Sequence, residues 1–191
     1  MSLDLIQIFK GYVNNYHTFN LTYTHTLHSF TMRELNYFFD LGIHLGYYPF
    51  TEDGADGDCR AMDLSWWTGW DQEAEEWEIL ELHLERENLP DKDEETLNKL
   101  FNQKRNYPPQ YMIGILTVKD LDRVNHLNKI ASKMIKSGEA LLIYYISKKI
   151  IDNYDIQGYL IKNHTISQAI KAIQKEDEDT GVLQLVLKDL Y

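Results

Sequence analysis

Apolar and polar residues alternate with a period of two along residues 77–87. One side of this repeat carries Leu80, Leu82 and Leu84 together with Glu78. The other side carries two apolar residues followed by acids and an imidazole: Trp77, Ile79, Glu81, His83, Glu85 and Glu87. Because side chains alternate across a β-strand, the pattern predicts a strand that packs its leucine face and presents a polar, mostly acidic row on the opposite face.

The rest of the chain divides into further segments with helical or strand patterns. Apolar spacing predicts helices over 3–13, 29–46, 93–107, 121–136 and 166–174. In the second of these, Thr31 and Glu34 have capping-box spacing and Gly46 is a helix stop. Apolar runs predict strands over 47–51, 60–67, 111–118, 140–146, 155–161 and 182–187. The acidic segment 52–58 predicts a turn-rich loop.

The predicted elements follow the order α-β-β-β-α-β up to residue 118 and α-β-β-α-β after it. Strand pairs followed by alternating helices and strands imply a mixed sheet in an α/β layer fold. A chain of 191 residues is long enough to bury a substantial core, and its 13% aromatic content is typical of a folded globule. We expect one domain over 1–191, with a core at about 30–118 and a C-terminal α/β extension at 119–191.

Composition limits the cellular compartments in which the protein is expected. The single cysteine, Cys59, excludes an internal disulfide and fits a reducing compartment. No apolar run approaches the roughly 20 residues of a membrane span, and the N-terminus lacks the pattern of a signal peptide. These features favour a cytoplasmic protein without a membrane partner.

The net charge of -11 is unevenly distributed. Residues 1–91 have a balance of -13, residues 92–174 a balance of +5, and residues 175–191 a balance of -3. The overall acidity argues against tight binding to a polyanion without a cation. The basic middle segment could form a positive wall beside a metal-bound acidic cleft, although ordinary surface charge explains it equally well.

The strands at 60–67 and 77–87 are consecutive and should form an antiparallel hairpin. A loop at 72–76 sets Asp63 opposite Glu85, whereas a loop at 68–76 sets it opposite Glu81. In both registers Asp63 lies on the acidic face, where opposed Cβ atoms are about 4.5–5.5 Å apart. Two carboxylates about 4 Å apart repel by roughly 4 kcal/mol at an effective dielectric of 20. The pattern therefore predicts a bound Mg²⁺ or Mn²⁺, or a retained proton.

These residues carry a family resemblance. Asp63 on one strand and Glu85-Arg86-Glu87-Asn88 on its neighbour, inside an α-β-β-β-α-β core, resemble the PD-(D/E)xK nuclease superfamily. The second motif is similar to a Glu-His-Glu-Asn version, with Arg86 in the histidine position and Glu87 in place of the usual lysine. The resemblance covers residues 30–118. It implies a restriction-endonuclease-like core and metal-dependent hydrolysis of phosphodiester bonds in nucleic acid.

The resemblance also implies a role for each candidate residue. Asp63 and Glu85 would hold Mg²⁺ or Mn²⁺, and Glu34 on the preceding helix would match a further acidic ligand. Glu87, or Lys99 supplied from the following helix, would orient or deprotonate water. The candidates for contact with phosphate are Lys104 and Arg105.

Simpler interpretations exist for the same residues. The acids could be solvated charges that protect an edge strand, and His83 could be a hydrogen-bonded polar group. The tryptophans at 66, 67, 70 and 77 could pack in the core, or line a cleft and stack a base or a sugar. A fold of this family without an active site would be a non-catalytic interaction or assembly protein, which the acidic charge and Glu87 also fit. The candidate partners are therefore nucleic acid or another protein.

Overall fold

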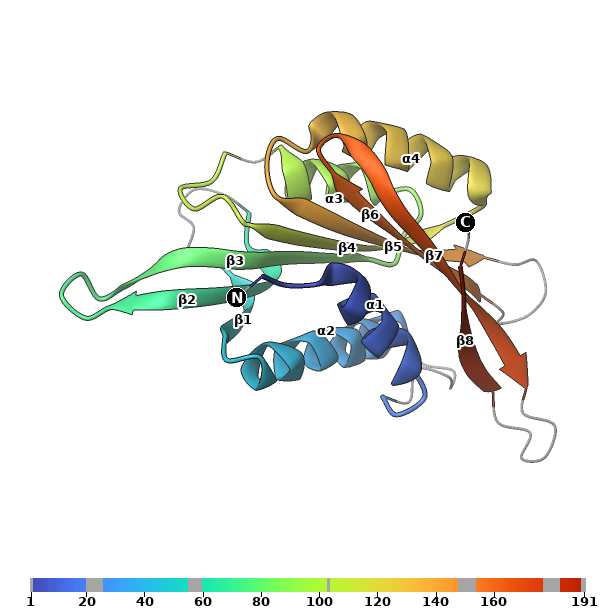
Figure 1. Cartoon of the computed structure of the whole chain (residues 1–191), viewed down its shortest axis with the longest axis horizontal. Helices are drawn as coiled ribbons and strands as arrows, with labels where there is room; N and C mark the ends of the chain where they lie inside the picture. Colours follow the sequence, from blue (N-terminus) through green and yellow to red (C-terminus); the bar gives the residue numbers. More distant parts are fainter. Residues whose placement is uncertain are drawn as a thin grey trace.

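The computed structural model describes residues 2–19, 26–54, 60–102, 104–147, 154–176 and 183–189 (Figure 1). Within these ranges eight strands form one sheet, in which they lie in sequence order. The strands are β1 (Tyr48–Asp53), β2 (Met62–Asp71), β3 (Glu76–Glu87), β4 (Tyr111–Val118), β5 (Glu139–Ser147), β6 (Tyr154–Lys162), β7 (Thr165–Glu176) and β8 (Leu183–Asp189). The helices are α1 (Leu5–Asn14), α2 (Leu27–His44), α3 (Asp93–Phe101) and α4 (Leu121–Met134). The predicted mixed α/β fold is confirmed.

The sheet combines antiparallel and parallel pairing. Strands β1 to β3 form one antiparallel meander, and β5 to β8 form another. Between them β3, β4 and β5 are parallel, which requires crossover connections, and α3 and α4 supply these. Both crossover helices pack on one face of the sheet, while α1 and α2 cover the other (Figure 1). From α2 to β4 the order is helix, three strands, helix, strand.

The central strands are buried on both faces. In β5, Leu141 and Ile143 face α1 and α2, whereas Leu142 and Tyr144 face α3 and α4. The same alternation continues in β4. A strand covered on both faces has no polar side to show in its sequence, which explains why 111–118 and 140–146 read as nearly continuous apolar runs.

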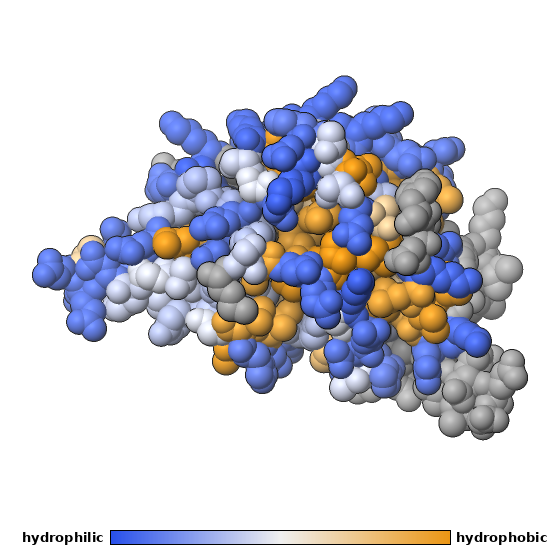
Figure 2. Space-filling view, viewed as in Figure 1, coloured by the Kyte–Doolittle hydropathy of each residue, from blue (hydrophilic) through white to orange (hydrophobic). Residues whose placement is uncertain are grey.

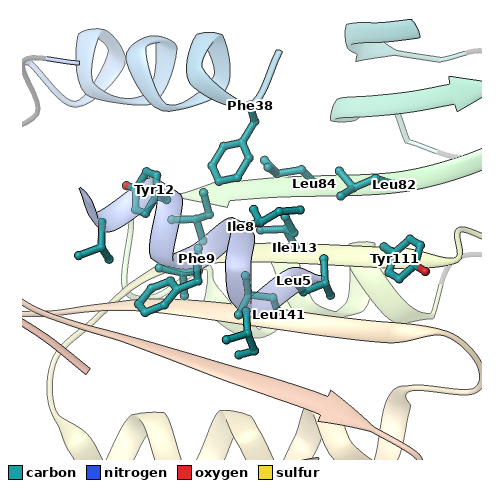
Figure 3. Close-up of a cluster of buried hydrophobic side chains, with 14 of the residues drawn as sticks. Leu5, Ile8, Phe9, Tyr12, Phe38, Leu82, Leu84, Tyr111, Ile113 and Leu141 are labelled. Carbon is teal, nitrogen blue, oxygen red and sulfur yellow. The ribbon is translucent and has the colours of Figure 1, made fainter. Parts of the chain in front are cut away.

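Helix α1 covers the middle of the sheet. It begins at Asp4, whose carboxylate accepts the N–H groups of Ile6 and Gln7 at 3.0 Å. Its apolar face packs over β3, β4 and β5 beside α2, as Figure 3 shows. The ring of Phe9 lies so close to Gly158 of β6 that a Cβ atom there would be 3.0 Å from it. A larger residue at this position of β6 would need the Phe9 ring to move by a few tenths of an ångström.

One predicted helix is wrong, because segment 166–174 belongs to strand β7. Its isoleucines recur at helical spacing, but the chain reverses at Asn163 and His164, whose φ angles are 51° and 63°. Lys162 pairs with Thr165, so β6 and β7 form a hairpin with a two-residue turn. Two positive φ values are the signature of a type I′ turn. Pairing with β6 and β8 on either side outweighs the local helical spacing.

Several helix boundaries also differ from the prediction. Helix α2 begins earlier, because Thr26 rather than Thr31 accepts the first free N–H, that of Ser29. Helix α3 ends at Phe101 rather than at 107. The predicted stop at Gly46 is confirmed, since this residue has a φ of 85° directly after α2.

Apolar residues gather in the middle of the face shown in Figure 2, over α1 and α2. The exposed large apolar side chains of α2 are Leu27, Met32 and Ile43. Among the residues that the structure describes, no helix has the length and apolar character needed to cross a membrane.

A pair of opposite charges is fully buried between α2 and β3. Arg86 Nε donates to Glu34 Oε2, and both side chains are at most 1% exposed. The hydroxyls of Tyr12 and Tyr145 donate to Glu34 Oε1 at 2.5 and 2.9 Å. Burial raises the pKa of both tyrosines well above the ordinary value, so they remain donors. Arg86 also donates to the backbone oxygen of Glu87 at 2.5 Å. Glu34 is therefore held on the α1 and α2 side of the sheet.

We expect Arg86→Met to destabilise the fold by about 3–5 kcal/mol, because it leaves Glu34 buried without its counter-charge. The double variant Glu34→Leu with Arg86→Met removes both charges and should lose less than the sum of the two single variants. Urea unfolding of the four proteins measures this. Glu95→Gln, at the exposed Arg60–Glu95 pair, is the control and should change stability much less. Strictly additive losses would contradict the pairing.

Candidate functional site

The β2–β3 hairpin sets two acidic side chains next to each other. Leu64 pairs with Leu84 and Ser65 with His83. One residue further, this register sets Asp63 beside Glu85, and Asp63 Oδ2 accepts the backbone N–H of Arg86 at 2.8 Å. The alternative with Asp63 opposite Glu81 is therefore wrong.

The hairpin reaches this register through a bulge. Near the turn, Asp71 pairs with Glu76, but the register shifts between Trp66 and Trp67. Trp66 pairs with Leu82 and Trp67 with Leu80, so Glu81 is the extra residue on β3. The bulge breaks the strict alternation assumed from the sequence. The predicted acidic row is therefore continuous only from His83 onward.

Lys99 of α3 joins the two carboxylates. Its Nζ lies 2.5 Å from Glu85 Oε2 and 3.2 Å from Asp63 Oδ1. Glu85 is almost completely buried, with 2% of its side chain exposed, whereas Asp63 is 31% and Lys99 16% exposed. The cluster Asp63–Glu85–Lys99 is thus open to solvent on the Asp63 side only.

Two features of α3 hold Lys99 in place. The buried side chains Leu97 and Leu100 pack α3 against the sheet. At the start of the helix, Arg123 of α4 donates to both carboxylate oxygens of the buried Asp93, at 2.8 and 2.5 Å. This bidentate pair fixes α3 to α4 and so sets the position from which Lys99 reaches β3.

Burial dominates the electrostatics of the cluster. It raises the pKa of Glu85 to about 7, although the charges of Lys99 and Arg105 oppose this shift. Burial, together with the neighbouring charge of Glu85, also raises the pKa of Asp63, while the hydrogen bond from the Arg86 N–H opposes it. Glu85 therefore exchanges its proton near neutral pH, where ordinary surface acids stay ionised.

A buried polar strip continues from the cluster across three strands. His83 Nε2 lies 2.5 Å from Glu85 Oε1, and the imidazole is fully buried. His83 is paired with Ser65 on β2. Ser65 Oγ donates to Asp53 Oδ2 at 2.5 Å, and the Trp67 indole N–H donates to the same oxygen at 2.6 Å. His83 thus contacts the Glu85 carboxylate at Oε1, the oxygen that does not contact Lys99.

The structure separates two other acidic candidates from this cluster. Glu34 lies on the opposite face of the sheet in its pair with Arg86, because consecutive residues Glu85 and Arg86 point to opposite faces of β3. Glu87 lies at the end of β3, half-buried, and its Oε1 accepts the backbone N–H of Leu89 at 2.8 Å.

The two basic candidates lie after α3 but differ in position. Lys104 is exposed, whereas Arg105 is partly buried and close enough to Glu85 to lower its pKa. Arg105 therefore extends the positive side of the cluster begun by Lys99.

Sequence reasoning missed Asp53 and assigned His83 no part in the site. Asp53 was assigned to the acidic loop, but β1 continues through it and the positive φ of Glu52, 50°, marks a local irregularity in the strand. The period-two pattern does place His83 beside Glu85. The predictions for Cys59 and for 55–58 of the acidic loop concern residues outside the described part of the chain.

The side-chain donors of the cluster decide which kind of divalent-cation site it could form. Within the described residues, no group of three His, Cys, Asp or Glu side chains is arranged to hold a metal. Asp63 and Glu85 nevertheless both contact the ammonium nitrogen of Lys99, so a small cation at that position would lie near both carboxylates. Mg²⁺ commonly uses only one or two protein carboxylates and completes its shell with water and phosphate. Two carboxylates fit that mode of binding and no closed protein cage.

Comparisons with protein-family models, with curated proteins and with solved structures gave no match. The geometry of the chain itself is therefore the basis for any functional proposal.

The raised pKa of Glu85 predicts a pH-dependent stability. In metal-free protein the folded state keeps a proton on Glu85 up to about pH 7, whereas the unfolded chain releases it near 4.5. The contribution of this proton to the free energy of unfolding is therefore complete below pH 4.5 and is lost as the pH rises through 7. The loss is on the order of 3 kcal/mol. Glu85→Gln should remove this part of the slope in urea unfolding measured from pH 5 to pH 8.

Glu95→Gln is the control for this measurement. Hydrogen bonds from Arg60 and Lys92 lower the pKa of Glu95, so it is ionised across the whole range. Its replacement should leave the slope unchanged. Parallel stability curves for wild type and Glu85→Gln would show that Glu85 does not hold the proton.

Proposed function

We propose that this chain is a metal-dependent phosphodiesterase of the PD-(D/E)xK type, acting on nucleic acid. The observation that carries the proposal is the convergence of Asp63, Glu85 and Lys99, from β2, β3 and α3, at one partly open site. These are an acid, an acid and a lysine in the elements where the family resemblance expects them. The observed order from α2 to β4 is also the α-β-β-β-α-β order of a restriction-endonuclease-like core.

Asp63 and Glu85 would hold Mg²⁺ or Mn²⁺ through their carboxylate oxygens. When bound, such a cation stabilises charge on a phosphate and makes water more acidic. Lys99 would then contact phosphate or water from α3, in place of the lysine that Glu87 replaces in the strand motif. His83 would keep Glu85 oriented through the contact with Oε1, which leaves Oε2 for the cation. Arg105 would add positive charge for the substrate.

We expect wild-type protein with Mg²⁺ or Mn²⁺ to cleave DNA, RNA or bis(p-nitrophenyl) phosphate. Asp63→Asn and Lys99→Met should each lower the rate by about 100-fold or more, the size expected when a group that acts on the reacting atoms is lost. Gel assays and release of nitrophenol measure the two kinds of substrate. Circular dichroism checks that each variant is folded.

Glu87→Gln is the matched control on the same strand, because the Glu87 carboxylate bonds to the Leu89 N–H rather than to the cluster. It should retain most of the activity. Wild type that leaves every substrate intact, or Asp63→Asn that cleaves as fast as wild type, would refute the proposal. Equal loss in Glu87→Gln would instead assign Glu87 a direct role.

The second candidate function is binding of a partner protein, and an exposed aromatic cluster favours it. The rings of Tyr48, Phe50 and Trp70 surround Trp77, with centroid distances of 4.4, 6.0 and 4.9 Å. Tyr48 is 55% and Trp70 47% exposed. These residues belong to β1 and to the β2–β3 hairpin, which extends beyond the helices in Figure 1. Rings left in water at the end of a hairpin are typical of an interaction site.

The charge around these rings indicates the charge of the partner. No Lys or Arg occurs between Arg60 and Arg86, while five acids lie on or near the hairpin turn: Asp71, Glu73, Glu75, Glu76 and Glu78. This surface repels nucleic acid and fits a basic segment of a partner protein, whose Arg side chains can stack on the rings and pair with the acids.

A labelled nona-arginine peptide should therefore bind saturably, as followed by fluorescence anisotropy. Trp70→Ala should weaken binding by at least about tenfold, and Trp70→Phe should restore part of it. Ile166→Ala, at an exposed apolar residue of β7, is the control and should have no effect. If Trp70→Ala binds the peptide as tightly as wild type, the aromatic cluster is not a binding site and the peptide is held only by non-specific attraction to the acids.

A further inference from the structure

A groove of about 760 Å³ lies between α4 and the turn that joins β6 to β7. None of the residues of the Asp63–Glu85–Lys99 cluster lines it. The lining residues are Asn125, Asn128, Lys129, Ser132, Lys133, His164, Thr165 and Ile166. The volume is in the range of sites that bind small molecules.

The floor of the groove contains a buried amide with an unused donor. Asn128 is 2% exposed, and its Oδ1 accepts the hydroxyl hydrogen of the buried Tyr144 at 3.0 Å. Its Nδ2 is buried and has no hydrogen-bond partner among the described residues. A buried N–H group without a partner costs free energy, so it indicates an acceptor that belongs in the groove.

The walls of the groove are basic. Lys129 and Lys133 lie one turn apart on α4, and neither makes an ion pair with a described residue. His164 faces them from the turn, where its Nδ1 lies 3.2 Å from the backbone oxygen of Ser132. This contact ties the turn to α4 and fixes the width of the groove. No acidic side chain is among the lining residues described, in a chain whose net charge is -11.

We propose that this groove binds a small phosphate-bearing molecule. Two lysines supply positive charge for a dianion, and the His164 imidazole and the Ser132 hydroxyl add short polar contacts. Asn128 Nδ2 donates to an oxygen of the ligand at the floor once the side chains that cover this nitrogen shift. Ile166, 45% exposed at the edge of the groove, packs against an apolar part of the ligand. The site is independent of the proposed phosphodiesterase.

The test is a ¹H–¹⁵N NMR titration of the full chain with inorganic phosphate and with 5′-AMP. Both should shift the amide signals of 125–133 and 163–166 with saturation. Asn128→Asp keeps an acceptor for the Tyr144 hydroxyl but removes the donor and adds a negative charge. It and the double variant Lys129→Ala with Lys133→Ala should each weaken binding by at least about tenfold.

The matched control is Lys119→Ala with Lys136→Ala, which removes two exposed lysines outside the groove and should leave binding unchanged. Adenosine and citrate are the ligand controls, and neither should bind as well as 5′-AMP. The proposal is overturned if no signal saturates at millimolar phosphate, or if the groove variants bind like wild type. Equal binding of adenosine would also overturn it, as would equal binding of citrate.

Discussion

Two consecutive buried charges of opposite sign, Glu85 and Arg86, constrain the whole arrangement around β3. A strand points consecutive side chains to opposite faces, so one helix layer cannot neutralise both. Arg86 takes Glu34 from α2 on one face, and Glu85 takes Lys99 from α3 on the other. An unpaired charge at either position would be expensive, so both helices must dock in a specific register. The packing of α2 and α3 on β3 is therefore coupled through two residues of one strand.

The sequence was sufficient for the alternation of β3 beyond the bulge, from Leu82 to Glu87, and for the strands buried on both faces. It also singled out Lys99, which contacts both Asp63 and Glu85. The sequence did not predict the partner of Glu34. The two interpretations of Glu34, as the capping-box partner of Thr31 and as an extra acidic ligand, both depended on local pattern. The actual partner, Arg86, is distant in the chain and is set only by the packing of α2 on β3.

The remaining errors have the same origin. The bulge at Glu81 shifts the hairpin register by one residue without a glycine there to mark it, so the loop expected at 72–76 gives the correct pairing beyond Trp66 but not next to the turn. At Asn163 and His164 the turn adopts the left-handed conformation without the Asn-Gly sequence that usually signals it. Both features gain their stability from pairing with a neighbouring strand, which spacing along one segment does not report.

The distribution of charge along the chain gives Lys99 two distinct tasks. Because no Lys or Arg occurs between Arg60 and Arg86, the acids of the hairpin depend on cations elsewhere in the chain, and Lys99 contacts both Asp63 and Glu85. Without a metal it is the counter-charge that makes burial of Glu85 tolerable. A divalent cation between the carboxylates would take over that task and release the ammonium group for a phosphate. In the proposed phosphodiesterase the same side chain would therefore stabilise the resting fold and act on a substrate, and the raised pKa of Glu85 would make the exchange between proton, lysine and metal accessible near neutral pH.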